Sequence, residues 1–155
     1  MKKAALLIND LRKLCTDDTV IMTAHVIKRC RERNIDSDSV IKVIMQGEII
    51  KQYEDDKPFP SCLLLGLSIN GKYLKGALNM NCFTCGSNHM IEATTIYVEK
   101  LENGILIVKN VPCKKCSQCG EEFFSMAIMK EIEKLSKQAE KIISEVMIID
   151  YNKAA

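Results

Sequence analysis

Apolar side chains recur at helical spacing near the start of the chain. Leu7, Leu11 and Leu14 lie three or four residues apart, which predicts a first helix. Thr23 is suited to cap a second helix that continues through Arg33, because its side-chain oxygen can accept a backbone N–H. The first part of the chain is therefore expected to be helical.

A third helix and an antiparallel sheet are expected next. Ser37 is suited to cap a short helix over 40–46, and Gly47 stands where a left-handed residue often ends a helix. Short apolar runs then alternate with turn residues, as in strands joined by hairpins. The expected strands cover 48–53, 61–69 and 72–78, with a proline-containing loop at 55–60 and a turn at Asn70-Gly71.

A second hairpin and a long helix are expected beyond residue 80. The stretches 91–101 and 105–111 flank Asn103-Gly104, a dipeptide typical of tight hairpins. Ser125 is suited to cap the helix, which has one apolar stripe and a lysine-rich face that should meet solvent. The stripe is Ile128, Ile132, Leu135, Ala139 and Ile142; the lysines are Lys130, Lys134, Lys137 and Lys141; a last strand covers 146–151. The fold class is therefore expected to be α+β.

Composition narrows the class of protein. The 155 residues include 22 Lys+Arg and 20 Asp+Glu, and the net charge of +2 is too small to indicate nucleic acid or membrane binding by itself. The longest run of apolar residues and glycine, 62–67, is far shorter than a membrane span. Asn9 and Asp10 interrupt the apolar stretch that a secretory signal would need. We therefore expect a cytoplasmic protein with no membrane partner.

Four of the eight cysteines form two pairs at metal-ligand spacing. Cys82 and Cys85 make the first Cys-x2-Cys pair, Cys116 and Cys119 make the second, and a glycine follows each pair. Two such loops can supply four thiolates in the tetrahedron that Zn²⁺ prefers. A set of four cysteines leaves no open coordination position. The pattern therefore predicts a structural zinc ion.

Other assignments of the cysteines stay open at this point. Cys113 and Cys116 are also separated by two residues, and His89 follows Cys85 closely enough to replace a ligand. Two disulfides would be the alternative in an oxidising compartment. The three isolated cysteines are expected to be buried thiols: Cys15, Cys30 and Cys62.

Several features of the second half occur together in a known family. They are Cys82-x2-Cys85-Gly86, the strand 94–97, the stretch 107–112, Cys116-x2-Cys119-Gly120-Glu121, and a helix followed by a strand. In these features residues 81–151 resemble the YgiT-type zinc finger, the N-terminal domain of MqsA-like antitoxins. The resemblance implies that the four paired cysteines bind zinc. No helix-turn-helix follows, so DNA binding is not expected.

The first half shows a second resemblance. Its motifs are His25-x3-Arg29-x3-Arg33-Asn34-Ile35, Gly47-Glu48-Ile49-Ile50, 56–62 and Asn70-Gly71-Lys72. In these motifs residues 20–78 are similar to MqsR and the wider RelE-like ribonuclease superfamily. In that family a strand that carries a His and then one further strand follow the hairpin. This chain has Lys75 near the position of that His, and the remaining part of the domain is missing. The expected domains are a truncated toxin-like domain over 1–79 and a zinc-finger antitoxin-like domain over 80–155.

A ribonuclease site would need cations and a proton donor or acceptor. His25, Arg29 and Arg33 lie at i, i+4 and i+8 of the expected helix, and Lys72 adds a cation on the hairpin. These four are the candidate catalytic residues. In the alternative reading His25 is structural and the arginines pair with Glu32, Asp36 or Asp55.

These features together predict a bacterial toxin–antitoxin protein, with an antitoxin-like zinc module fused to an inactive or self-inhibited toxin remnant. The expected partner is a RelE- or MqsR-like toxin or the chain's own first half, and the terminal strand or a partner chain would cover the sheet edge left by the truncation. RNA and a second copy of the chain are further candidate partners. The alternatives are a latent mRNA endonuclease and a non-catalytic zinc-ribbon adaptor for nucleic acid.

Overall fold

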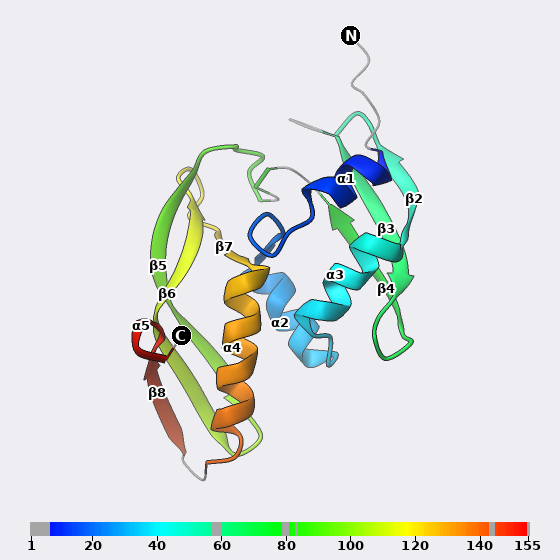
Figure 1. The fold of residues 1–155 in the computed structure, drawn as a ribbon. Coiled ribbons are helices and arrows are strands. Elements are labelled where there is room, and N and C mark those ends of the chain that lie inside the picture. The colour runs from blue at the N-terminus through cyan, green and yellow to red at the C-terminus, as the bar shows by residue number, and fades with distance from the viewer. Residues whose placement is uncertain (1–6, 57–59, 79–80, 83, 143–144, 155) are drawn as a thin grey trace.

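Two β-sheets and the helices packed on them make up the chain, as Figure 1 shows. The computed structural model describes residues 7–56, 60–78, 81–82, 84–142 and 145–154. A three-stranded sheet lies in the first half of the sequence, and a five-stranded sheet is formed mainly by the second half. The α+β class expected from the sequence is confirmed. Within the described residues, no helix is long and apolar enough to span a bilayer.

The three helices expected in the first half are present. They are α1 (Ile8–Leu14), α2 (Ala24–Glu32) and α3 (Ser37–Gln46). Thr23 Oγ1 accepts a hydrogen bond from the Val26 N–H at 3.2 Å, so the predicted cap of α2 is confirmed. Asn34 follows α2 with a φ of 53°, a left-handed conformation that ends the helix.

The two ends of α3 differ from the prediction. Asp36, not Ser37, is the N-cap, and its carboxylate accepts the N–H of Ser39 at 2.8 Å. Gly47 has a φ of −74°, so it is not left-handed. A Cβ at that position would lie 2.4 Å from the carbonyl oxygen of Val43. The glycine is required by lack of space and not by its backbone conformation.

The N-terminal sheet is antiparallel and has the order β2-β3-β4. Its strands are β2 (Glu48–Tyr53), β3 (Ser61–Leu67) and β4 (Tyr73–Leu78), and residues 57–59 of the expected loop lie outside the described residues. The predicted turn at Asn70-Gly71 is confirmed, since the Ser68 N–H donates to the Lys72 carbonyl and Gly71 has a φ of 73°. Helix α3 packs against β3.

The five-stranded sheet is organised around β6. Its strands are β1 (Ile21–Thr23), β5 (Met90–Leu101), β6 (Gly104–Cys116), β7 (Glu122–Ser125) and β8 (Val146–Asp150). Strand β6 pairs antiparallel with β5 on one side, and with β8 (parallel) and β7 (antiparallel) on the other. The β5–β6 turn consists of Glu102 and Asn103, one residue earlier than the sequence suggests.

Two pairings in this sheet were not evident from the sequence pattern. Strand β1 belongs to the first half of the chain and pairs with β7 of the second half. Strand β8 pairs with β6 and is followed by α5 (Tyr151–Ala154). The expectation that the terminal strand covers an edge of the N-terminal sheet is therefore wrong. Every second residue of β8 points inward, so a place beside β6 lets Met147 and Ile149 pack against the core.

Helix α4 (Met126–Ala139) covers one face of the five-stranded sheet. Ser125 caps it as predicted, accepting the N–H of Ile128 at 3.4 Å. The buried part of the stripe is Ile132, Leu135 and Ala139, whereas Ile142 lies beyond the helix and is exposed. Ile27 of α2 belongs to the same core cluster. One core therefore contains side chains from both halves of the sequence.

Candidate metal centre and the contact between the halves

Two loops bring four cysteines together at one end of the β5–β6 hairpin. Cys82 and Cys85 precede β5, Cys116 ends β6, and Cys119 lies in the turn before β7. The four Sγ atoms all lie within 4.8 Å of one another. The Sγ atoms of Cys82 and Cys119 are 3.5 Å apart, as are those of Cys85 and Cys116. This cluster could hold a metal ion.

The two loops share one backbone geometry. The N–H of Cys82 donates to the Ser87 carbonyl, and the Gly86 N–H donates back to the Cys82 carbonyl. Cys116 makes the same two bonds, with the carbonyl of Glu121 and the N–H of Gly120. Both glycines are left-handed, with φ values of 74° and 79°. The glycine after each pair is therefore explained by the sharp turn that aims two sulfurs at one point.

Backbone N–H groups inside the second loop face a sulfur. The N–H groups of Cys119 and Gln118 donate to Cys116 Sγ and lower the pKa of this thiol to about 6, against the opposing effect of desolvation. A thiolate is the form that binds metal. The loop thus favours the ionised form of Cys116, whereas desolvation and the neighbouring cysteines raise the pKa of Cys85 and Cys119.

Polar contacts join the two cysteine loops. The N–H and the hydroxyl of Ser117 both donate to the backbone carbonyl of His89, at 3.0 and 3.2 Å. Within the first loop, Asn81 Nδ2 donates to the Gly86 carbonyl at 3.0 Å. Cys82 and Cys116 rest on Phe123, with Ile21 and Met90 packed beside them. The apolar base of the cluster thus includes Ile21, from the first half of the chain.

The structure separates the alternative ligands from the cluster. Cys113 is 2% exposed and lies in the main core, because residues three apart on a strand point to opposite faces and Cys116 faces the cluster. His89 contributes its backbone carbonyl to the loop contact described above. All eight cysteines are free thiols, so the alternative of two disulfides does not describe this structure. Of the isolated cysteines, Cys62 is buried, as predicted, and Cys15 and Cys30 are half-buried.

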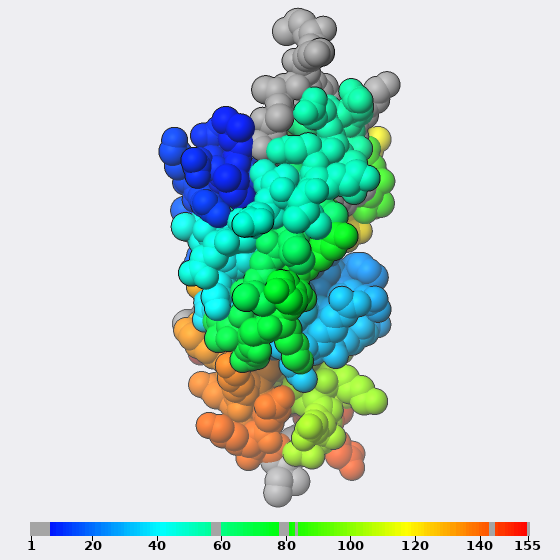
Figure 2. All heavy atoms as spheres, turned by 90° about the vertical axis from the view of Figure 1, so that its right-hand side faces the viewer, coloured from blue at the N-terminus to red at the C-terminus, as the bar shows by residue number. Residues whose placement is uncertain are grey.

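The four candidate catalytic residues lie on the surface. His25 and Arg29 are exposed on α2, which Figure 2 shows at the surface beside the N-terminal sheet. Arg29 Nη1 lies 3.6 Å from a carboxylate oxygen of Glu32, one of the pairings foreseen for a structural role. Arg33 follows the last helical residue, and Lys72 is exposed in the β3–β4 turn.

The polar side chains that connect the two halves are not the candidate catalytic residues. Arg31 Nε lies 3.2 Å from Glu99 Oε1, and the Ser136 hydroxyl donates to the other oxygen of Glu99 at 2.6 Å. Nothing in the local sequence indicates this contact, because Arg31 and Glu99 are far apart along the chain. Arg31 and Glu99 are both partly buried, which distinguishes Arg31 from its exposed neighbours Arg29 and Arg33.

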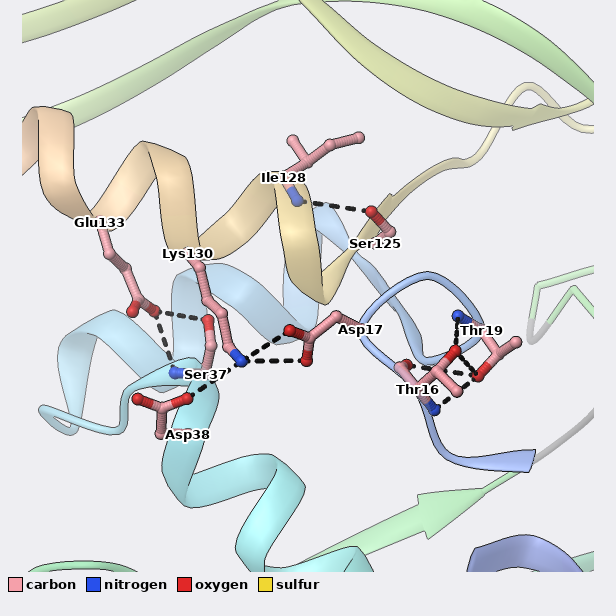
Figure 3. A network of polar contacts seen from close by, with 9 residues as sticks. All are labelled: Thr16, Asp17, Thr19, Ser37, Asp38, Ser125, Ile128, Lys130 and Glu133. Carbon is pink, nitrogen blue, oxygen red and sulfur yellow. Dashed lines mark hydrogen bonds and ion pairs between the residues drawn. The ribbon is translucent and has the colours of Figure 1, made fainter. Parts of the chain in front are cut away.

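Helix α4 makes two further contacts with the first half, which Figure 3 shows. Lys130 Nζ lies 2.8 Å from Asp17 Oδ2 and 3.2 Å from Asp38 Oδ1. The carboxylate of Glu133 accepts both the N–H and the hydroxyl of Ser37, at 3.0 and 2.7 Å. The prediction that Lys130 faces solvent alone is wrong, since two carboxylates of the other half pair with it.

A comparison with protein families gives one match. The family described as a domain of unknown function, DUF4258, matches residues 22–115. The matched stretch begins in β1 and ends in β6, so it includes parts of both halves. No curated protein and no solved structure matches the chain.

Proposed function

The chain belongs to the DUF4258 family, and from its own geometry we propose that it is a toxin–antitoxin protein whose zinc-binding, antitoxin-like module holds a toxin-like first half in cis. The proposal has two parts: the identity of the metal and the role of the contact between the halves. Each part rests on residues described above.

The donor set supports zinc. In a tetrahedron with metal–sulfur bonds of about 2.3 Å, neighbouring sulfurs lie about 3.8 Å apart. The distances in the cluster, from 3.5 Å up to 4.8 Å, include that value. Four soft thiolates favour zinc over harder cations, and they leave no coordination position for a substrate. The ion would therefore fix the two loops and supply no catalysis.

The observation that carries the functional part is the contact of α4 with the first half. Lys130 and Glu133 reach Asp17, Asp38 and Ser37 across that contact. Strand β1 adds backbone pairing to β7. An antitoxin that neutralises by binding needs a surface of this kind on its toxin, and here both surfaces belong to one chain.

The candidate catalytic residues of the first half are arranged more like those of an inhibited domain than like an assembled nuclease site. His25 and Arg29 share a helix face, but Arg29 faces Glu32 and Lys72 belongs to another element. A latent endoribonuclease is the second candidate, favoured by the exposure of His25 and Arg29 on one face of α2. A latent endoribonuclease would require the contact between the first half and α4 to open before its cationic side chains could come together in one site.

Induction of the full-length chain in bacteria, together with RNA cleavage in vitro, tests the proposal. The wild-type protein should neither arrest growth nor cleave RNA. A Lys130→Glu, Glu133→Lys variant opens the contact, and Lys134→Glu, on the same helix, is the matched control. Growth arrest by the opened variant that disappears with His25→Ala would identify self-inhibition. RNA cleavage by the zinc-loaded wild type would contradict the proposal and favour an active nuclease.

Metal content is measured on the same preparations. Wild type is expected to hold one zinc per chain by elemental analysis. Cys116→Ser should lose the ion, whereas Cys113→Ala should retain it because Cys113 lies in the core. Equal loss from both variants would contradict the ligand set.

A further inference from the structure

The face of the β5–β6–β8 sheet that points away from α4 carries a grid of aliphatic side chains. Leu106 and Val108 point into the core, so Ile105 and Ile107 point outward. Register places Val98 beside Ile107 on one side, and Ile148 lies beside Ile107 on the other. These three residues form the central row of the grid.

Two further rows flank it. One of them contains Ile105 of β6, which pairs with Lys100 of β5 and with Val146 of β8. In the other, Lys109 of β6 pairs with Asp150 of β8, and Ile96 of β5 lies beside the irregular part of the β5–β6 pairing. We call the aliphatic members the outer patch: Ile96, Val98, Ile105, Ile107, Val146 and Ile148. Five of the six are between 42% and 60% exposed.

A patch of this composition fits another sheet. Its members are all β-branched and come from three neighbouring strands, which gives the flat apolar surface that packs face to face in sandwiches. Contiguous aliphatic surface of this kind is uncommon on a protein that stays monomeric. A second copy of the chain offers an identical sheet face.

The charges at the corners favour one arrangement of two copies. Lys100 and Asp150 occupy diagonally opposite corners, and Ile96 and Val146 occupy the other two. A two-fold axis along the Ile96–Val146 diagonal sets Lys100 of each copy opposite Asp150 of the other. An axis along the remaining diagonal would set like charges together. Asn110 Nδ2 donates to both oxygens of Asp150 at 3.2 Å, and Lys109 of the same chain lies beside that carboxylate on the neighbouring strand.

We propose that the chain forms a two-fold dimer through the outer patch, with Lys100 of each copy paired to Asp150 of the other. The patch lies toward the Gly104 end of β6, whereas the cysteine cluster lies at the Cys116 end. Dimerisation therefore leaves the metal centre free, and it does not depend on the toxin–antitoxin role.

Sedimentation equilibrium of the metal-loaded, full-length protein, from about 1 to 100 µM, tests the dimer. Wild type should show twice the chain mass of 17.5 kDa. Val98→Glu should weaken the dimer by at least about tenfold, because it places a charge in the centre of the apolar contact. The matched control is Ile50→Glu, on β2, where the side chain is 44% exposed outside the patch. Circular dichroism and metal content show that each variant is folded.

Charge reversal tests the arrangement within the dimer. Lys100→Glu should weaken association, and adding Asp150→Lys to the same chain should restore it, since the opposite charges then face each other again. A wild type that stays monomeric throughout the range would overturn the proposal. A dimer that Val98→Glu leaves intact, or that the second reversal does not restore, would overturn it equally.

Discussion

Gly47 illustrates how a single residue can be fixed by its surroundings. It lies between α3 and β2, where its missing side chain lets the carbonyl groups of Val43 and Leu65 approach. Its backbone is extended, which any residue can adopt. Gly76, in β4, is the opposite case, since nothing lies within 4 Å of the Cβ it lacks.

Gly47→Ala is therefore expected to destabilise the protein by about 1–3 kcal/mol, because the added methyl would meet backbone oxygens at 2.4 and 2.7 Å. Urea unfolding monitored by circular dichroism measures the change. Gly76→Ala should be nearly neutral by the same measurement. Equal effects of the two substitutions would contradict the steric explanation.

Tyr97 gives a prediction on pH. Its ring packs edge-on against Phe124 with centroids 6.2 Å apart. Burial, aided by the nearby Glu99 carboxylate, raises the pKa of Tyr97 to about 12. The folded pKa lies above the unfolded value of about 10, so the neutral phenol stabilises the fold below pH 10, and this contribution is lost as pH rises toward 12.

The free energy of unfolding should consequently fall between about pH 10 and 12, and the Tyr97→Phe variant should show a smaller fall. Denaturant titrations at several pH values measure both. A fall of equal size in the variant would show that other groups are responsible.

Helix α3 depends on a residue of a different element. Asp36 caps it locally, and the pKa of that carboxyl is lowered because the Ser39 side chain and N–H donate to it. Glu133 of α4 adds a second carboxylate at the same helix end, bonded to Ser37. A negative charge there also interacts favourably with the helix dipole. The start of α3 is thus fixed jointly by its own sequence and by α4.

Glu133→Ala should lower the free energy of unfolding by about 1–2 kcal/mol, the usual effect of losing a helix cap. Chemical denaturation measures it. Glu131→Ala is the control, because Glu131 pairs only with Lys134 on the same helix among the ion pairs that the structure describes. A loss of similar size from both variants would show that the contact to α3 contributes nothing particular.

At the scale of the whole molecule, the two halves of the chain contribute to the same core and to the same sheet. Ile27 lies in the main core, Ile21 contacts the base of the cysteine cluster, and β1 extends the larger sheet. The separation into 1–79 and 80–155 remains a prediction about the origin of the sequence. These contacts imply that removing an ion from the cysteine cluster would affect the fold beyond the cysteine loops.

Chelation should lower the melting temperature by more than about 10 °C, because metal binding contributes directly to folding free energy. Scanning calorimetry with and without EDTA measures this. Wild type is expected to unfold in one transition that includes both halves. A second transition unaffected by EDTA would show that the first half folds independently of the metal.

The sequence alone determined most of the local elements. Helical spacing, Thr23 and Ser125 as caps, and the Asn70-Gly71 turn all depend on nearest neighbours, so pattern was sufficient for them. The cysteine pairs were equally evident, since two ligands three positions apart form a site from one loop. Cys113 could be separated from the cluster only by the strand register, which sets which face each residue takes.

The tertiary structure decided how the elements meet. The pairing of β1 with β7, the place of β8 beside β6, and the partners of Arg31, Lys130 and Glu133 join residues far apart in the chain. No periodicity records such contacts, because each depends on which faces pack together once all elements have formed. The exposed grid on the larger sheet likewise needed β8 in place before its three strands could be seen as one surface.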